Sequence, residues 1–168
     1  MHRCVGSHGI AVPKKASQPH HRNLPLLMLQ AREHVIAYFR PILNAHGITE
    51  QQWRIVRVLL SAEPLEPREI GELCRLSSPS LAGVLARMEE LGFVARRRFD
   101  HDQRRVHVSL TPRSRALAKL MAPQIDATYR EIDRVLGPEL SSRLRKTLDD
   151  LVLALASRSD VGDPAKRR

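Results

Sequence analysis

Two groups of arginines carry the clearest chemistry in this sequence. Arg96, Arg97 and Arg98 are consecutive, and Arg104 and Arg105 follow after a short loop. A guanidinium is permanently charged and offers paired N–H donors to phosphate, so these side chains are candidate ligands of a nucleic-acid backbone. Three consecutive arginines cannot all point into a core, and plain surface charge is the alternative interpretation.

The loop between the two groups, residues 100–103, favours the functional interpretation. Asp102 precedes Arg104 by two residues, a spacing that lets a carboxylate hold a guanidinium across the neck of the loop. Arg105 then stays available for a nucleic-acid groove, together with Arg97 and Arg98. An Arg104 held in this way supports the loop without touching DNA, and both roles remain open for it.

Two strands frame this loop. Val106, Val108 and Leu110 alternate with Arg105, His107 and Ser109, as in a strand with one buried face. Residues 93–99 are the expected partner, which makes the arginine-rich loop the tip of a hairpin.

Two short helices precede the hairpin. Apolar residues at helical spacing mark the first helix, Ile70, Leu73 and Cys74, and the second, Leu81, Val84, Leu85, Met88 and Leu91. Ser78 is the expected N-cap of the second helix, with Pro79 at its first position and Gly92 closing it. Two helices, a tight turn and a hairpin are the layout of a winged helix-turn-helix.

The second helix has a polar face that suits DNA. Ser80 and Arg87 lie opposite the apolar stripe, and Ser78 stands at the helix start, where free backbone amides favour phosphate. An arginine bidentate to guanine contributes ~1 to 3 kcal/mol of discrimination. We therefore expect Ser78, Ser80 and Arg87 to face the major groove.

Long helical patterns flank this unit. Within residues 24–48, apolar side chains recur at intervals of three and four residues, as in a helix with one buried face. Thr49 and Gln52 then form a capping box for the helix that follows. After Thr111, a long helix runs through Pro123, which is expected to kink it. A last helix carries a near-heptad leucine stripe that one subunit alone does not cover.

We therefore predict a mainly α fold in which a winged helix-turn-helix lies between dimerisation helices. The expected segments are a disordered basic arm (1–23), an N-terminal dimerisation helix (24–48), the DNA-binding domain (49–111), C-terminal dimerisation helices (112–157) and a flexible tail (158–168). A homodimer places two recognition helices ~34 Å apart, which suits a palindromic operator on double-stranded DNA. A monomeric bundle is the alternative.

Composition agrees with a polyanionic partner. The chain has 168 residues, a net charge of +10 and a pI near 10.7. No apolar run is long enough for a membrane span or an export signal, and two distant cysteines suggest a reducing compartment, so we expect a cytoplasmic protein. Enzyme motifs, metal-ligand spacing and cofactor loops are absent from the sequence, which predicts neither catalysis, nor a metal, nor a cofactor.

The hairpin motif resembles the wing signature of the MarR family of bacterial transcription regulators. Asp102 and Arg104, followed at fixed spacing by Leu110 and Thr111, carry the resemblance, together with Leu-Gly-Phe-Val at 91–94. Blocks at 29–33, 38–41 and 49–54 look like the branch of homoprotocatechuate-operon repressors. The resemblance covers roughly residues 24–156.

This resemblance implies a repressor of an aromatic-catabolic operon, released from DNA by a small aromatic carboxylate. The acid is of the hydroxyphenylacetate or the 6-hydroxynicotinate type, and the sequence does not choose between them. Arginines would neutralise the carboxylate, and aromatic or histidine side chains would stack and hydrogen bond; the implied set is Arg32, His34, Tyr38, Arg40, Trp53 and Arg57, with Arg54 as a further cation. Trp53 as a core residue is the alternative.

Two other regulatory classes remain open from sequence. A redox-responsive regulator would use Cys4 or Cys74, although a cysteine on an apolar helix face is usually buried and inert. A nonspecific architectural DNA-binding protein would share the charge but not the operator preference.

Overall fold

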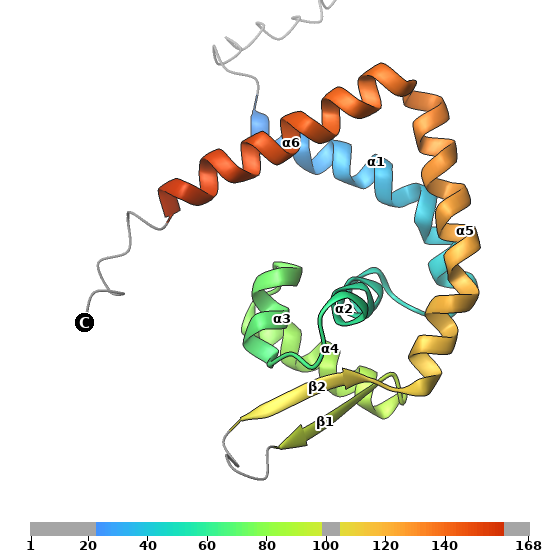
Figure 1. Ribbon diagram of the computed structural model, residues 1–168, viewed down its shortest axis with the longest axis vertical. Coiled ribbons are helices and arrows are strands. Elements are labelled where there is room, and N and C mark those ends of the chain that lie inside the picture. Colours follow the sequence, from blue (N-terminus) through green and yellow to red (C-terminus); the bar gives the residue numbers. More distant parts are fainter. Residues whose placement is uncertain (1–22, 99–104, 160–168) are drawn as a thin grey trace, which may run out of the picture. The chain divides into compact units, whose positions relative to one another are not determined.

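The computed structural model describes residues 23–98 and 105–159, which form six helices and one antiparallel hairpin (Figure 1). The elements are α1 (Leu24–Ala45), α2 (Glu50–Ser61), α3 (Pro67–Cys74), α4 (Ser78–Glu90), β1 (Val94–Arg98), β2 (Val106–Leu110), α5 (Pro112–Leu136) and α6 (Pro138–Ser159). The chain divides into two compact units, residues 1–34 and 35–168, so α1 begins in one and ends in the other. The expected mainly α fold with a hairpin wing is confirmed.

None of the helices in the described ranges is both long and apolar enough to cross a membrane.

Local sequence signals set the start of α2. The Thr49 hydroxyl accepts the Gln52 N–H at 3.3 Å, and the Gln52 side-chain oxygen accepts the Thr49 N–H at 2.9 Å. The predicted capping box is therefore present, and it satisfies two amides that the first helical turn leaves without partners.

The turn between α3 and α4 differs by one residue from the prediction. Ser77, not Ser78, is the N-cap of α4, because the Ser77 carbonyl accepts the first helical hydrogen bond, from the Leu81 N–H at 2.9 Å. The Ser77 hydroxyl makes no cap hydrogen bond and donates instead to the Ser80 hydroxyl at 3.0 Å. Pro79 accordingly occupies the second helical position, where a backbone N–H would have no partner within the helix, so its absence costs nothing.

The core of the helix-turn-helix contains most of the predicted apolar positions. Ile70, Cys74, Leu81, Leu85 and Met88 are all buried. Leu73 is not, since 58% of its surface is exposed, which corrects its expected place in the core. Helix α3 has eight residues and buries only the narrow stripe that positions 70 and 74 share, and position 73 lies a full 100° of helical rotation away from 74.

The hairpin pairs Val94 with Leu110 at its base and Arg98 with Val106 at its far end. Val108 and Leu110 are buried, as the alternation predicted, whereas Val106 at the far end is only half-buried. Val94 of β1 is buried as well. Gly92 connects α4 to β1 with φ +67°, a left-handed conformation that side chains disfavour. Leu65, from the linker between α2 and α3, exchanges both backbone hydrogen bonds with Val108 at 2.8 and 3.2 Å. The linker therefore adds one rung of pairing to the wing.

Helix α5 continues through Pro123 and buries Met121, Ile125 and Ile132. At its end, the Asp133 carboxylate accepts hydrogen bonds from the Ser141 hydroxyl at 2.5 Å and from Arg145 at 2.7 Å. These two donors, the hydroxyl first, lower the pKa of Asp133 and fix the corner between α5 and α6. Helix α6 leaves much of its predicted leucine stripe exposed: Leu140, Leu144, Leu148 and Leu155.

Candidate functional site

The outward face of α4 is polar, as its sequence pattern predicted. Ser78, Ser80 and Arg87 are exposed there, while the opposite face of the helix packs into the core. The Arg87 guanidinium pairs with Glu90, three residues on, at 2.9 Å. An exposed pair of this kind contributes only ~0 to 1 kcal/mol, so a phosphate or a base edge can displace it. This face can therefore enter a major groove.

The wing arginines have different surroundings. Arg97 and Arg98 are exposed and project from opposite faces of β1, because they are neighbours in a strand. Arg96 pairs with Glu89 of α4 at 3.2 Å, which ties the strand to the preceding helix. The predicted wing pair, Asp102 with Arg104, lies outside the described residues.

Arg105 is held by a carboxylate. Its Nε donates to Glu66 Oε1 at 2.6 Å, and Glu66 is the N-cap residue of α3. Arg105 is predicted to contact DNA, and the structure shows that its guanidinium also has a partner on the helix-turn-helix. Arg105 remains 57% exposed, so one guanidinium can support the wing and still present donors to solvent.

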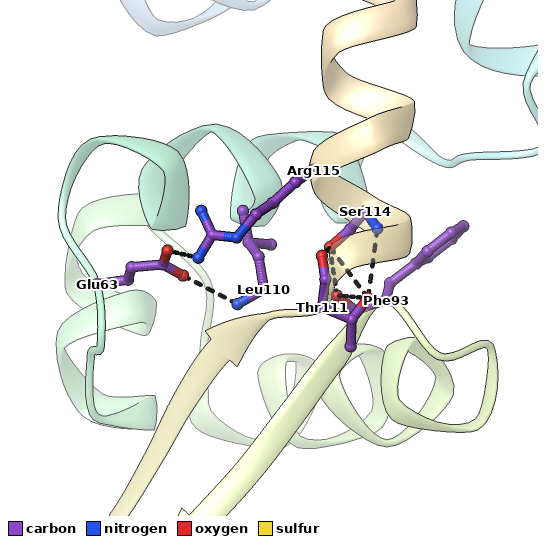
Figure 2. A network of polar contacts seen from close by, with 6 residues as sticks. All are labelled: Glu63, Phe93, Leu110, Thr111, Ser114 and Arg115. Carbon is purple, nitrogen blue, oxygen red and sulfur yellow. Dashed lines mark hydrogen bonds and ion pairs between the residues drawn. The ribbon is translucent and has the colours of Figure 1, made fainter.

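Polar contacts clamp the base of the wing to its surroundings (Figure 2). Glu63 Oε2 accepts the Leu110 N–H at 2.9 Å, and the same carboxylate forms an ion pair with Arg115. On the other side, the Thr111 hydroxyl donates to the Gly92 carbonyl and the buried Ser114 hydroxyl donates to the Phe93 carbonyl, both at 2.7 Å. The base of the hairpin is therefore fastened to the start of α5 on both sides: through Glu63 at Leu110 of β2, and through Thr111 and Ser114 at the two residues before β1.

A second polar cluster joins α2 and α5. Arg57 Nη1 donates to the Tyr129 hydroxyl at 2.8 Å, and the guanidinium carbon lies 6.0 Å from the centre of the tyrosine ring. Phe39 meets Tyr129 edge to face, with ring centroids 5.0 Å apart and an interplanar angle of 61°. A guanidinium with further donors, a phenol that can donate its own proton, and an aromatic edge can together bind a small aromatic acid.

The other residues predicted for ligand binding have different local surroundings. Trp53 is half-buried and packs against the core, while Tyr38 is 43% exposed. Arg40 lines a separate hollow of about 360 Å³ between the end of α1 and the start of α2. Within residues 1–34, Arg32 pairs with the adjacent Glu33 at 2.7 Å, and His34 is exposed.

Comparison with known proteins identifies the family. Residues 46–105 match the model of the MarR family. Over 140 residues the chain is 37% identical to the homoprotocatechuate degradative operon repressor of Escherichia coli, covering 83% of this chain and 95% of that protein. The chain belongs to the MarR family. The resemblance of the wing and of the upstream blocks is thus confirmed.

Two further MarR-type regulators are similar along most of their length. The transcriptional regulator FarR of Neisseria gonorrhoeae is 37% identical over 135 residues, which cover 80% of this chain and 92% of FarR. The crystal structure of NadR in complex with 4-hydroxyphenylacetate superposes with a TM-score of 0.69 at 36% identity, covering 82% of this chain and 97% of NadR. Family membership makes this chain a DNA-binding transcription regulator, with the winged helix-turn-helix as its DNA-binding unit.

Several residues that organise these MarR-type sites gave no signal in the sequence. In the sequence, Tyr129 only continues the helical spacing of apolar residues after Met121 and Ile125, and its hydrogen bond with Arg57, 72 residues away, is seen only in the structure. Glu63 and Glu66 lie in a short linker where carboxylates are common, and nothing local shows that they reach the wing. Such contacts depend on the tertiary arrangement of three elements.

Cys74 lies against the helix-turn-helix core rather than at the surface. Only 1% of its surface is exposed, and burial raises the pKa of its thiol, an effect that the nearby Arg54 partly offsets. A thiol that stays protonated and inaccessible is a poor sensor of oxidants. Cys4, the other cysteine, lies outside the described residues.

Proposed function

We propose that this chain is a dimeric repressor of an operon for aromatic-compound catabolism, released from a palindromic operator by a hydroxyphenylacetate-type acid. The observation that carries the effector is the cluster of Arg57, Tyr129 and Phe39. It joins a cation, a phenolic hydroxyl and an aromatic edge, which match the carboxylate and the ring of such an acid.

The DNA-binding half of the proposal depends on α4 and the wing. Ser78, Ser80 and Arg87 are the proposed major-groove residues, and the wing arginines, of which Arg97 and Arg98 are described, are the proposed phosphate or minor-groove ligands. The exposed leucines of α6 support a two-fold interface. Two recognition helices ~34 Å apart then enter successive major grooves of a palindrome.

The 36% sequence identity to NadR, whose structure contains 4-hydroxyphenylacetate, favours that class of acid over a hydroxynicotinate. An effector that binds the DNA-free form more tightly lowers operator affinity by the ratio of its two affinities. Tyr129 lies on α5, and the start of α5 is hydrogen bonded to the base of the wing, so a change at Tyr129 has a direct physical connection to the DNA-binding unit.

The test begins with selection of binding sites from randomised duplexes, followed by anisotropy titrations with the selected operator and with a random duplex at the same salt. We expect a palindromic site that is bound far more tightly than the random duplex. Affinities that are equal would favour the architectural alternative. Adding 4-hydroxyphenylacetate should weaken operator binding, and 6-hydroxynicotinate is the second acid to titrate.

Replacing Arg57 tests the effector site itself. Arg57→Gln removes a charged donor, and loss of a hydrogen bond to a charged group weakens binding of the acid by about 10- to 100-fold. Operator affinity without the acid should stay within about threefold, because Arg57 lies outside the DNA-binding face. Arg143→Gln, at an exposed arginine of α6, is the matched control. A wild-type response to the acid in Arg57→Gln would refute this site.

The dimer has its own measurement. Sedimentation at micromolar concentration should give a species of twice the mass of the chain. A single species of monomer mass would rule out the two-fold mode of operator binding.

A further inference from the structure

Arg54 links helix α2 to the end of helix α3. Its Nη1 donates to the Cys74 carbonyl at 2.8 Å, and its Nη2 donates to Glu50 Oε1 at 2.7 Å. The side chain is 33% exposed, so water only partly competes for these bonds. One planar guanidinium therefore connects the first turn of α2 with the last residue of α3.

The Cys74 carbonyl is one of the orphan acceptors that every helix leaves at its C-terminal end. A cation there satisfies the carbonyl and compensates the negative end of the helix dipole. Arg75, the next residue, turns into the left-handed region with φ +52° and ψ +48°. Arg54 thus holds the residue at which the helix-turn-helix turn begins.

The turn itself is compact. Leu76 N–H donates to the Gly71 carbonyl at 3.0 Å, and a Cβ on Gly71 would lie only 3.3 Å from the Leu76 carbonyl oxygen. Only three residues separate Cys74 from Ser78, the first residue of α4. A shift of the Cys74 carbonyl is therefore passed to the start of α4 with little chain to absorb it.

We propose that Arg54 is a positioning residue for operator recognition, which sets the start of α4 relative to α2. The inference rests on the proposed role of α4 as the recognition helix. Arg54 lies on a different helix from the DNA-facing side chains, and its two hydrogen bonds are both made within the protein. Its effect on DNA is therefore exerted through the placement of Ser78, Ser80 and Arg87.

A positioning role predicts a loss of selectivity, whereas a merely stabilising role does not. Base-edge contacts need α4 at a defined place in the groove, but nonspecific binding depends mainly on charge. Loss of folded protein lowers the apparent affinity for every duplex by the same factor. The readout is therefore the ratio of operator affinity to random-duplex affinity, measured at one salt concentration.

Arg54→Met keeps the aliphatic stem and removes both hydrogen bonds. We expect its selectivity ratio to fall about tenfold, as for loss of one or two interactions that align the helix. Arg68→Met is the matched control, because Arg68 pairs with Glu72 at 3.0 Å on the exposed side of α3 and joins no second element in that pair. Its ratio should stay within about twofold of wild type.

Circular dichroism at the assay temperature verifies that each variant is folded. Folded Arg54→Met and Arg54→Gln proteins with the wild-type ratio would overturn the inference. If both variants are unfolded, Arg54→Lys decides, because it keeps the charge and one hydrogen bond at a time. A reduced ratio in folded Arg54→Lys supports positioning, and a wild-type ratio there overturns it.

The same titrations separate this inference from the proposed function. The wild-type protein could bind operator and random duplex equally tightly, or Arg87→Ala could leave operator affinity unchanged. Either result would remove the recognition role of α4, and the inference would fail with it. A selective wild type whose selectivity needs Arg87 but not Arg54 would overturn the inference alone.

Discussion

The hydroxyl of Thr111 makes a quantitative prediction about the base of the wing. It accepts the Ser114 N–H at 3.3 Å, as the N-cap of α5, and donates to the Gly92 carbonyl at 2.7 Å. Thr111→Ala removes both interactions in a single change. Thr111→Ser keeps the hydroxyl and loses only a methyl group.

The expected loss has two parts. An N-cap of this type stabilises by ~1 kcal/mol, and a neutral hydrogen bond contributes ~1 kcal/mol net. Gly92 is half-exposed, so water can reach its carbonyl, and the larger penalty for an orphaned buried acceptor does not apply. Thr111→Ala should therefore lower the free energy of unfolding by about 2 kcal/mol, which for a chain of this size is a fall in Tm of about 4 to 8 °C.

Urea unfolding followed by circular dichroism measures this loss, at one protein concentration because the stability of a dimer depends on concentration. Thr147→Ala is the control: its hydroxyl donates to the Arg143 carbonyl within exposed helix α6, and its removal should cost less than about 0.5 kcal/mol. Thr111→Ser should recover most of the stability. A Thr111→Ala variant within about 0.5 kcal/mol of wild type would refute the clamp.

Three further outcomes follow from the described residues. Gly92→Ala should lower the free energy of unfolding by about 1 kcal/mol, since alanine is strained at φ +67°, and an unchanged urea midpoint would contradict this. The pKa of Asp133 is lowered by the Ser141 hydroxyl and a neighbouring guanidinium, so its contribution is present at neutral pH and is lost as pH falls through the lowered value. Thermal unfolding should therefore show the gap between wild type and Asp133→Asn shrinking below pH ~4, whereas a constant gap would exclude this linkage. With the other cysteine replaced by serine, Cys74 should react with a thiol reagent slowly in buffer and rapidly in urea, and equal rates would contradict its burial.

Features that depend on neighbouring residues were predictable from sequence. The Thr49 to Gln52 capping box needs only four residues, and the alternation of Val106, Val108 and Leu110 needs five. The wing strands and the order of the helices followed from such short-range rules. The resemblance to the MarR family then indicated a transcription regulator, because the motif that carries it lies in the same hairpin.

Features that depend on the depth of packing were not predictable. Leu73 fits a helical stripe in sequence, but α3 buries only Ile70 and Cys74 and leaves Leu73 58% exposed. Arg54 looked equivalent to Arg57 as a cation for a carboxylate, since both stand on α2. The structure separates them: Arg54 meets a backbone carbonyl, and Arg57 meets a phenol.

Helix α5 gives the wing a mechanical connection to the rest of the protein. Its first turn is bonded to the residues just before β1 and follows β2 directly in the chain, while Tyr129 lies about 27 Å beyond Thr111 at 1.5 Å per residue. At that length a tilt of about 5° about Tyr129 moves the first turn by about 2 Å, more than the tolerance of a hydrogen bond. Helix α5 is thus a lever arm, and the wing moves with its end because two hydroxyl groups hold it there.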